Sequence, residues 1–124
     1  MSTVLIIEDN EKNMKLARDV LQAKGYKTLE AVTGEEGVAL GKQHVPDLVL
    51  MDIQLPGING IEAFKQIRAD AKTAKVPVVA LTASVTPTDR SAISAAGFDA
   101  FVSKPINLKE FLETVKRLVD EAKK

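Results

Sequence analysis

The feature that most constrains the fold is a regular alternation between short apolar runs and longer amphipathic stretches. Five runs are expected to form strands, at residues 3–7, 27–31, 47–52, 76–82 and 100–103. After each run, apolar residues recur at the spacing of an amphipathic helix. Strands and helices that alternate in this way favour an α/β fold, in which a doubly wound parallel sheet of five strands has helices on both faces.

The second helix is the least regular of the five. Thr33 with Glu36 three residues later predicts a capping box at its start. Three glycines lie on or near it, and a glycine inside a helix costs roughly 1 kcal/mol relative to alanine. Gly37 and Gly41 are four residues apart on one face, so we interpret them as sites of close packing. Other helix boundaries are indicated by Gly25, Asn59, Thr86, Pro87 and Gly97.

Composition narrows the class of protein. The chain has 124 residues, enough for one domain, and we expect a stand-alone domain over 1–124. Its formal net charge is zero, which argues against nucleic acid as a direct partner. It has no cysteine, which excludes thiol chemistry and disulfides. No window predicts a signal peptide or a membrane span, so we expect a cytoplasmic protein without membrane contact.

Polar residues follow four of the five apolar runs. The first run ends in Glu8 and Asp9, the third in Asp52, the fourth in Thr82 and the fifth in Lys104. In open parallel sheets, ligands bind beyond the carboxyl ends of the strands, so these residues are expected to meet at one edge. Taken singly, an acid such as Asp9 could be only a helix cap; the joint placement favours a site.

The residue types in this set indicate its chemistry. Crowded carboxylates raise one another's pKa, and a divalent cation relieves that repulsion. All the candidate ligands are oxygens, which suits Mg²⁺. A lysine and a hydroxyl can bind the oxygens of a phosphoryl group. The set therefore predicts transfer of a phosphoryl group to a carboxylate.

Four motifs in this order resemble a known family. They are IIEDN at the first run, LVLMDIQLPGING at the third, VVALTA at the fourth and FVSKPI at the fifth. Together they resemble the receiver domain of bacterial response regulators over essentially the whole chain. The resemblance implies a CheY-like, flavodoxin-like (βα)5 fold with strand order 2-1-3-4-5. It also implies a place in a two-component phosphorelay.

The resemblance implies a role for each acid of the site. Asp52 is expected to accept a phosphoryl group from a sensor histidine kinase or a phosphotransfer protein. Glu8, Asp9, Asp52 and the backbone carbonyl of Gln54 are expected to hold Mg²⁺. Many members carry aspartate where this chain has Glu8, and the longer side chain is expected to reach the metal through water.

It also implies a phosphate-binding and switching set. Lys104 is expected to pair with the phosphoryl oxygens, and its bond to Pro105 is expected to be cis. Thr82 and the backbone N–H of Ala83 are expected to donate to the phosphate. Phe101, where tyrosine is frequent in the family, is expected to swing inward when Thr82 moves. Gln54 and Ser84, each two residues beyond a key group, are expected to tune the lifetime of the aspartyl phosphate.

Two subfamilies share the first helix and its approach. EDNEKNMKLARDVLQAKGY and the closing FLETVKRL are similar to DivK-type single-domain regulators of cell division and polarity. Receiver domains of hybrid histidine kinases also share EDN followed by Asn13, so a receiver fragment or partner of such a kinase is the alternative. We interpret Asn13 as a polar surface residue of the helix.

Output is expected through binding of another protein rather than through catalysis. The face formed by the fourth helix, fifth strand and fifth helix is the predicted docking surface, and the fourth helix, with few apolar residues, is the predicted moving part. An aspartate-nucleophile phosphatase of the haloacid dehalogenase type is the enzymatic alternative, but it requires D-x-D after the first strand. A nucleotide-binding module would need a glycine-rich loop after a strand, which this chain lacks.

Overall fold

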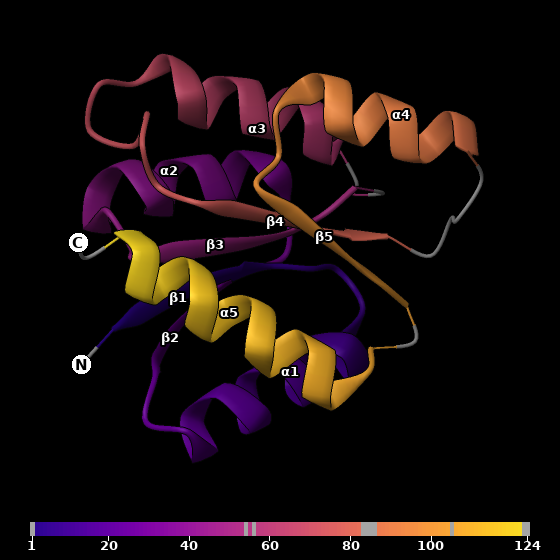
Figure 1. Ribbon diagram of the computed structural model, residues 1–124. Helices are drawn as coiled ribbons and strands as arrows, with labels where there is room; N and C mark the ends of the chain where they lie inside the picture. Colours follow the sequence, from indigo (N-terminus) through magenta and orange to yellow (C-terminus); the bar gives the residue numbers. More distant parts are fainter. Residues whose placement is uncertain (1, 54, 56, 83–86, 105, 123–124) are drawn as a thin grey trace.

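A five-stranded parallel sheet with helices on both faces forms the frame of the molecule (Figure 1). The computed structural model describes residues 2–53, 55, 57–82, 87–104 and 106–122, with backbone alone for 87–90 and 122. The strands are β1 (Thr3–Ile7), β2 (Lys27–Ala31), β3 (Leu48–Asp52), β4 (Val78–Thr82) and β5 (Ala100–Ser103). The helices are α1 (Glu11–Ala23), α2 (Gly34–His44), α3 (Gly60–Ala69), α4 (Pro87–Ala96) and α5 (Leu108–Ala122).

The sequence predicted these strands closely. Three have the predicted bounds, while β3 begins one residue later than expected and β4 two residues later, after Pro77. The strand order β2-β1-β3-β4-β5 confirms the order that the family resemblance implied. Among the residues that the structure describes, no helix is long and apolar enough to cross a bilayer.

The register of the strands brings their carboxyl ends level. Ile7 at the end of β1 pairs with Met51 of β3, and Asp52 at the end of β3 pairs with Leu81 of β4. Thr82 at the end of β4 pairs with Ser103, the last residue of β5. The residues that follow β1, β3, β4 and β5 therefore emerge at the same edge of the sheet.

Alternation along the strands divides the core into two layers. Successive side chains point to opposite faces, and both faces are covered, so β1, β3 and β4 read as continuous apolar runs. Helices α1 and α5 cover one face and α2, α3 and α4 lie on the other (Figure 1). The stripe that α5 buries consists of Phe111, Val115, Leu118 and Val119.

The two glycines on one face of α2 have different environments. A Cβ added at Gly37 would lie 2.3 Å from Cδ1 of Ile7, too close for any side chain, so close packing is confirmed there. A Cβ added at Gly41 would lie 3.6 Å from Cδ2 of Leu5, an ordinary contact. The packing interpretation is therefore wrong for Gly41.

The start of α2 differs in one bond from the predicted capping box. Thr33 is the N-cap, and its Oγ1 accepts a hydrogen bond from the N–H of Glu36 at 3.1 Å. The Glu36 carboxylate does not return the bond to Thr33. It accepts from the N–H of Val32, one residue earlier, at 3.1 Å. Both bonds still satisfy backbone donors at the start of the helix.

Candidate functional site

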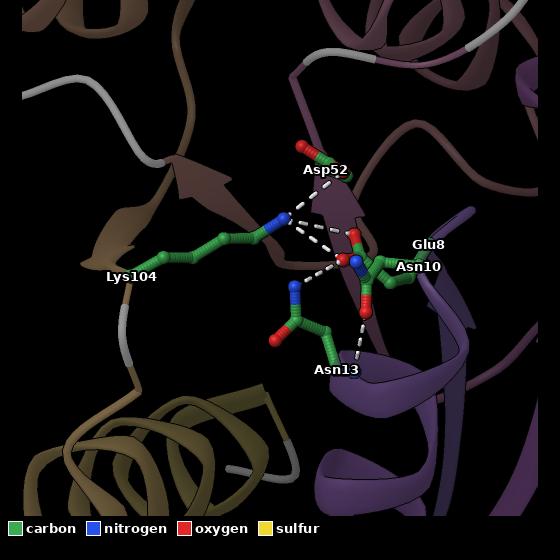
Figure 2. Close-up of polar contacts among 5 residues, drawn as sticks. All are labelled: Glu8, Asn10, Asn13, Asp52 and Lys104. Atoms are coloured by element: carbon green, nitrogen blue, oxygen red, sulfur yellow. Dashed lines mark hydrogen bonds and ion pairs between the residues drawn. The ribbon is translucent and has the colours of Figure 1, made fainter.

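One lysine joins two buried carboxylates at the carboxyl edge of the sheet. Lys104 follows β5, and its Nζ lies 2.8 Å from Oε1 and 3.1 Å from Oε2 of Glu8. The same Nζ lies 3.0 Å from Oδ2 of Asp52. Figure 2 shows the lysine reaching across to both acids, which come from the ends of β1 and β3. The structure thus brings together residues up to 96 positions apart in sequence.

Burial controls the charge state of Glu8. Its side chain is fully shielded from solvent, and Asp52 is only 4% exposed. Burial and the neighbouring Asp52 raise the pKa of Glu8 from 4.5 to about 7, against the lowering effect of hydrogen bonds from Lys104 and Asn13. Near neutral pH this carboxyl group is therefore poised between its protonated and ionised forms.

Lys104 responds to the same environment in the opposite sense. Burial lowers its pKa, but the hydrogen bonds and negative charges of Glu8 and Asp52 outweigh burial and raise the pKa above its usual value. The ammonium group therefore stays charged and acts as the counter-charge of the two acids.

Asp9 completes the acidic cluster from the solvent side. It is exposed, yet one carboxylate oxygen each of Glu8, Asp9 and Asp52 lies within 4.8 Å of the others. Three carboxylates at this separation form a donor set that fits a hard divalent ion such as Mg²⁺. The exposure of Asp9 leaves one side of the cluster open to water, which Mg²⁺ retains in its coordination shell.

The backbone around Asp52 is tightly held. The N–H of Ile53 donates to the carbonyl of Leu81 at 3.1 Å, and the N–H of Gly60 donates to the carbonyl of Ile53 at 2.9 Å. A Cβ added at Gly60 would lie 2.3 Å from the carbonyl oxygen of Asp52, so α3 begins directly against the strand end. Asn59 caps this helix by accepting from the N–H of Glu62 at 2.9 Å. Hydrogen bonds and packing therefore hold the backbone that carries the Asp52 carboxylate in place.

Two more of the predicted residues lie on β4 and β5. Thr82 ends β4 and is buried, and its carbonyl accepts a hydrogen bond from the N–H of Lys104 at 2.8 Å. Phe101 lies on β5 and is 39% exposed. The predicted residues Gln54, Ala83, Ser84 and Pro105 lie outside the described residues.

Two asparagines have roles that the sequence reading missed. Asn10, not Asp9, is the N-cap of α1, because its Oδ1 accepts from the N–H of Asn13 at 3.1 Å. Asn13 is not a simple surface residue, since its Nδ2 donates to Oε1 of Glu8 at 2.9 Å. The signal was in the run EDNEKN, where two asparagines three residues apart fit a helix cap and its first turn.

The fold, the level strand ends and the lysine-bridged acids define one class of protein. The chain belongs to the response regulator receiver domain family, whose model matches residues 4–116. This family match favours the receiver interpretation over the haloacid dehalogenase and nucleotide-binding alternatives.

Relatives within this family include a regulator of cell polarity. The chain is 43% identical over 120 residues to the polar-differentiation response regulator DivK of Brucella ovis, and the match covers 97% of this chain and 98% of the relative. Among solved structures, CheY4 of Vibrio cholerae matches with a TM-score of 0.89 at 26% identity, over 95% of this chain and 98% of that one. The receiver domain of sensor histidine kinase PA1611 of Pseudomonas aeruginosa, with magnesium in its active-site cleft, matches with a TM-score of 0.90 at 29% identity, over 96% and 98%.

Proposed function

We propose that this receiver domain accepts a phosphoryl group on Asp52 from a histidine kinase or a phosphotransfer protein. The observation that carries the proposal is the Lys104 ammonium group within 3.0 Å of Asp52 and 2.8 Å of Glu8, at an edge where Asp9 adds a third carboxylate. In the transfer, the bond between phosphorus and the donor histidine nitrogen breaks. A bond between phosphorus and a carboxylate oxygen of Asp52 forms in its place.

The acidic cluster supports a requirement for Mg²⁺. Glu8, Asp9 and Asp52, with the carbonyl of Gln54, would hold the ion, which supplies positive charge to the phosphoryl oxygens. Glu8 is the most buried of the three acids, and Asp9 is exposed. This difference in exposure supports a contact between Glu8 and the ion at the buried side of the site, either direct or through a water molecule. Solvent then reaches the ion from the side of Asp9.

The positive and neutral donors have separate tasks in this proposal. Lys104 holds the two acids until a phosphoryl group arrives, and then pairs with its oxygens. The hydroxyl of Thr82 and the N–H of Ala83 donate to the same oxygens. Because Thr82 ends β4 and Lys104 directly follows β5, with a backbone bond between them, the site is expected to need little rearrangement before transfer. Autocatalysed gain and loss of the phosphoryl group is the only chemistry proposed.

The signal is proposed to leave through the α4–β5–α5 face. Phe101 lies on this face, two residues from the strand end that carries Lys104 and next to β4, which carries Thr82. Movement of Thr82 toward the phosphate would reposition Phe101, Pro105 and α4, and so change the surface offered to a partner protein. Equal amide exchange over residues 87–104 with and without a phosphate mimic would contradict this route.

The relative named above supports a biological context. The match between this chain and DivK extends over 98% of that protein. This supports a stand-alone receiver domain over 1–124 that acts in control of cell polarity or division. A hybrid histidine kinase as source or partner is the alternative, supported by the likeness to the receiver domain of a sensor kinase. A cytoplasmic location stays a prediction.

Intact mass spectrometry tests the central step. The protein is incubated with acetyl phosphate and Mg²⁺, and the fraction that gains the mass of one phosphoryl group is measured. We expect the gain in the wild type, its loss in Asp52→Asn, and its loss when a chelator removes Mg²⁺.

A matched control separates Asp52 from acids in general. Asp19 is an exposed acid on α1 that pairs with Arg18, far from the strand ends in sequence and outside the acidic cluster. Asp19→Asn should gain the phosphoryl group as the wild type does. An equal mass gain in wild type and Asp52→Asn would refute the assignment of Asp52.

A further inference from the structure

Glu8 has a second donor that the proposed function does not use. The Nδ2 of Asn13, in the first turn of α1, lies 2.9 Å from Oε1 of Glu8. Figure 2 shows Asn13 approaching Glu8 from the helix, while Lys104 approaches from the opposite strand. Asn13 is half-buried, so its amide makes this bond partly shielded from water.

The two carboxylate oxygens of Glu8 accept different sets of hydrogen bonds. Oε1 accepts from both Lys104 at 2.8 Å and Asn13 at 2.9 Å, whereas Oε2 accepts from Lys104 at 3.1 Å. In the proposed function, Lys104 turns to the phosphoryl group. Among the side chains that the structure describes, Asn13 is then the N–H donor that stays on Glu8 and fixes the orientation of its carboxylate.

The position of Asn13 is itself fixed by a neighbour. Its backbone N–H donates to Oδ1 of Asn10, the N-cap, at 3.1 Å, which ties the first turn of α1 to the segment that follows β1. Asn10 therefore helps to fix the position of Asn13, and Asn13 in turn helps to orient the Glu8 carboxylate. Both links lie within residues 8–13, so the arrangement is local in sequence.

The pair also depends on the length of the acid at position 8. Glutamate extends one methylene group further from the strand end than aspartate does. An aspartate at this position would withdraw the carboxylate from Asn13. The bond to Asn13 therefore gives a physical reason for glutamate at a position where the family often has aspartate.

We propose that Asn13 is a positioning residue, which holds the Glu8 carboxylate in the orientation that binds Mg²⁺ and so sets the affinity for the ion. This inference rests on the proposed metal site at Glu8, Asp9 and Asp52. Partners that orient metal ligands through hydrogen bonds typically change metal affinity by roughly 10–100-fold when removed.

Calorimetric titration of the full chain with MgCl₂ tests the proposal without any phosphorylation step. We expect Asn13→Ala and Asn13→Leu to weaken Mg²⁺ binding by about tenfold, at the low end of that range. The leucine variant keeps the branched shape of the side chain without its hydrogen-bonding groups and favours the helix, so it controls for the cavity that alanine leaves. Gln22→Ala is the matched control: it removes another amide hydrogen bond of α1, to Thr28 Oγ1 at 2.9 Å, and should leave affinity unchanged.

A second background distinguishes positioning from a general loss of structure. In Glu8→Asp, the carboxylate no longer reaches residue 13, so Asn13→Ala should change Mg²⁺ affinity by less than about twofold. An equal loss in both backgrounds would overturn the proposal, because the effect would then not pass through Glu8. Unchanged affinity in Asn13→Ala and Asn13→Leu, with normal binding by the wild type, would also overturn it and leave the proposed function standing. A wild type that binds no Mg²⁺ would overturn both.

Discussion

Glu8 at the carboxyl edge of the sheet and the apolar core beneath it are equally buried, but they are stabilised in different ways. Ile7 and Glu8 are neighbours in the chain, and their exposures are 0% and 1%. Ile7 is stabilised by the removal of apolar surface from water. Glu8 loses hydration on burial and depends on Lys104 and Asn13 to offset that cost. The comparison teaches that burial by itself stabilises an apolar residue, whereas a buried charged residue depends on its partners.

The largest expected effect comes from removing the lysine that pairs with the acids. Lys104→Met would leave Glu8 and Asp52 buried together without their counter-charge, so we expect the free energy of unfolding to fall by about 3 kcal/mol at about pH 8. Urea denaturation without metal measures this loss. Added Mg²⁺ should recover part of it, because the ion replaces the missing positive charge at the acids.

An exposed lysine provides the control for Lys104. Lys109 lies in the first turn of α5, and Lys109→Met should change the free energy of unfolding by no more than about 0.5 kcal/mol. Equal losses in the two variants would show that the buried acids do not need the lysine, and the contrast between core and edge would fail.

The next effect concerns the core. Gly37→Ala places a methyl group against Ile7, so we expect a loss of about 2 kcal/mol in the free energy of unfolding. Gly41→Ala meets only an ordinary contact, and it should be neutral or stabilise by up to about 1 kcal/mol through helix propensity. Denaturation of both variants checks the pair, and phosphorylation of Asp52 should persist in each. If both variants lost the same stability, close packing at Gly37 would not explain its glycine.

The third effect is a dependence of stability on pH. The pKa of Glu8 is raised from 4.5 to about 7, so the folded state holds this proton to higher pH than the unfolded state does. Stability from this group is therefore greatest at low pH and is lost as the pH rises from 4.5 to about 7. We expect the loss in metal-free protein to be at most about 3 kcal/mol, the free energy that corresponds to a pKa change from 4.5 to about 7.

Glu8→Gln isolates this contribution. The variant cannot ionise at position 8, so the difference in unfolding free energy between variant and wild type should widen in favour of the variant as the pH rises over this range. A constant difference from pH 4.5 to about 7 would contradict a raised pKa for Glu8.

Most of the fold followed from the sequence because its signals are local. Apolar runs separated by helical patterns gave the strands within two residues, and parallel strands necessarily bring their carboxyl ends to one edge. The convergence of Glu8, Asp9, Asp52 and Lys104 could therefore be predicted without a structure. The order of the strands could not be derived this way and came from family resemblance.

What the sequence could not provide was the pairing of individual side chains. Asp9 and Glu8 are adjacent acids of one cluster, yet one is exposed and the other buried. Either Asp9 or Asn10 could have capped α1, and only the backbone geometry decides between them. The bond from Asn13 to Glu8 depends on that choice, so it could not be assigned in advance.

Lys104 gives the acidic site a positive charge that is part of the chain. Such a charge cannot diffuse away or be diluted, because it is covalently part of the chain and the backbone bond from Lys104 to Thr82 fixes the residue at the strand end. A free cation that enters between Glu8 and Asp52 competes with the ammonium group of Lys104 for the same carboxylate oxygens. We therefore expect Lys104 to stabilise the fold when metal is scarce, and to make the site bind a dissolved ion more weakly than three carboxylates alone would.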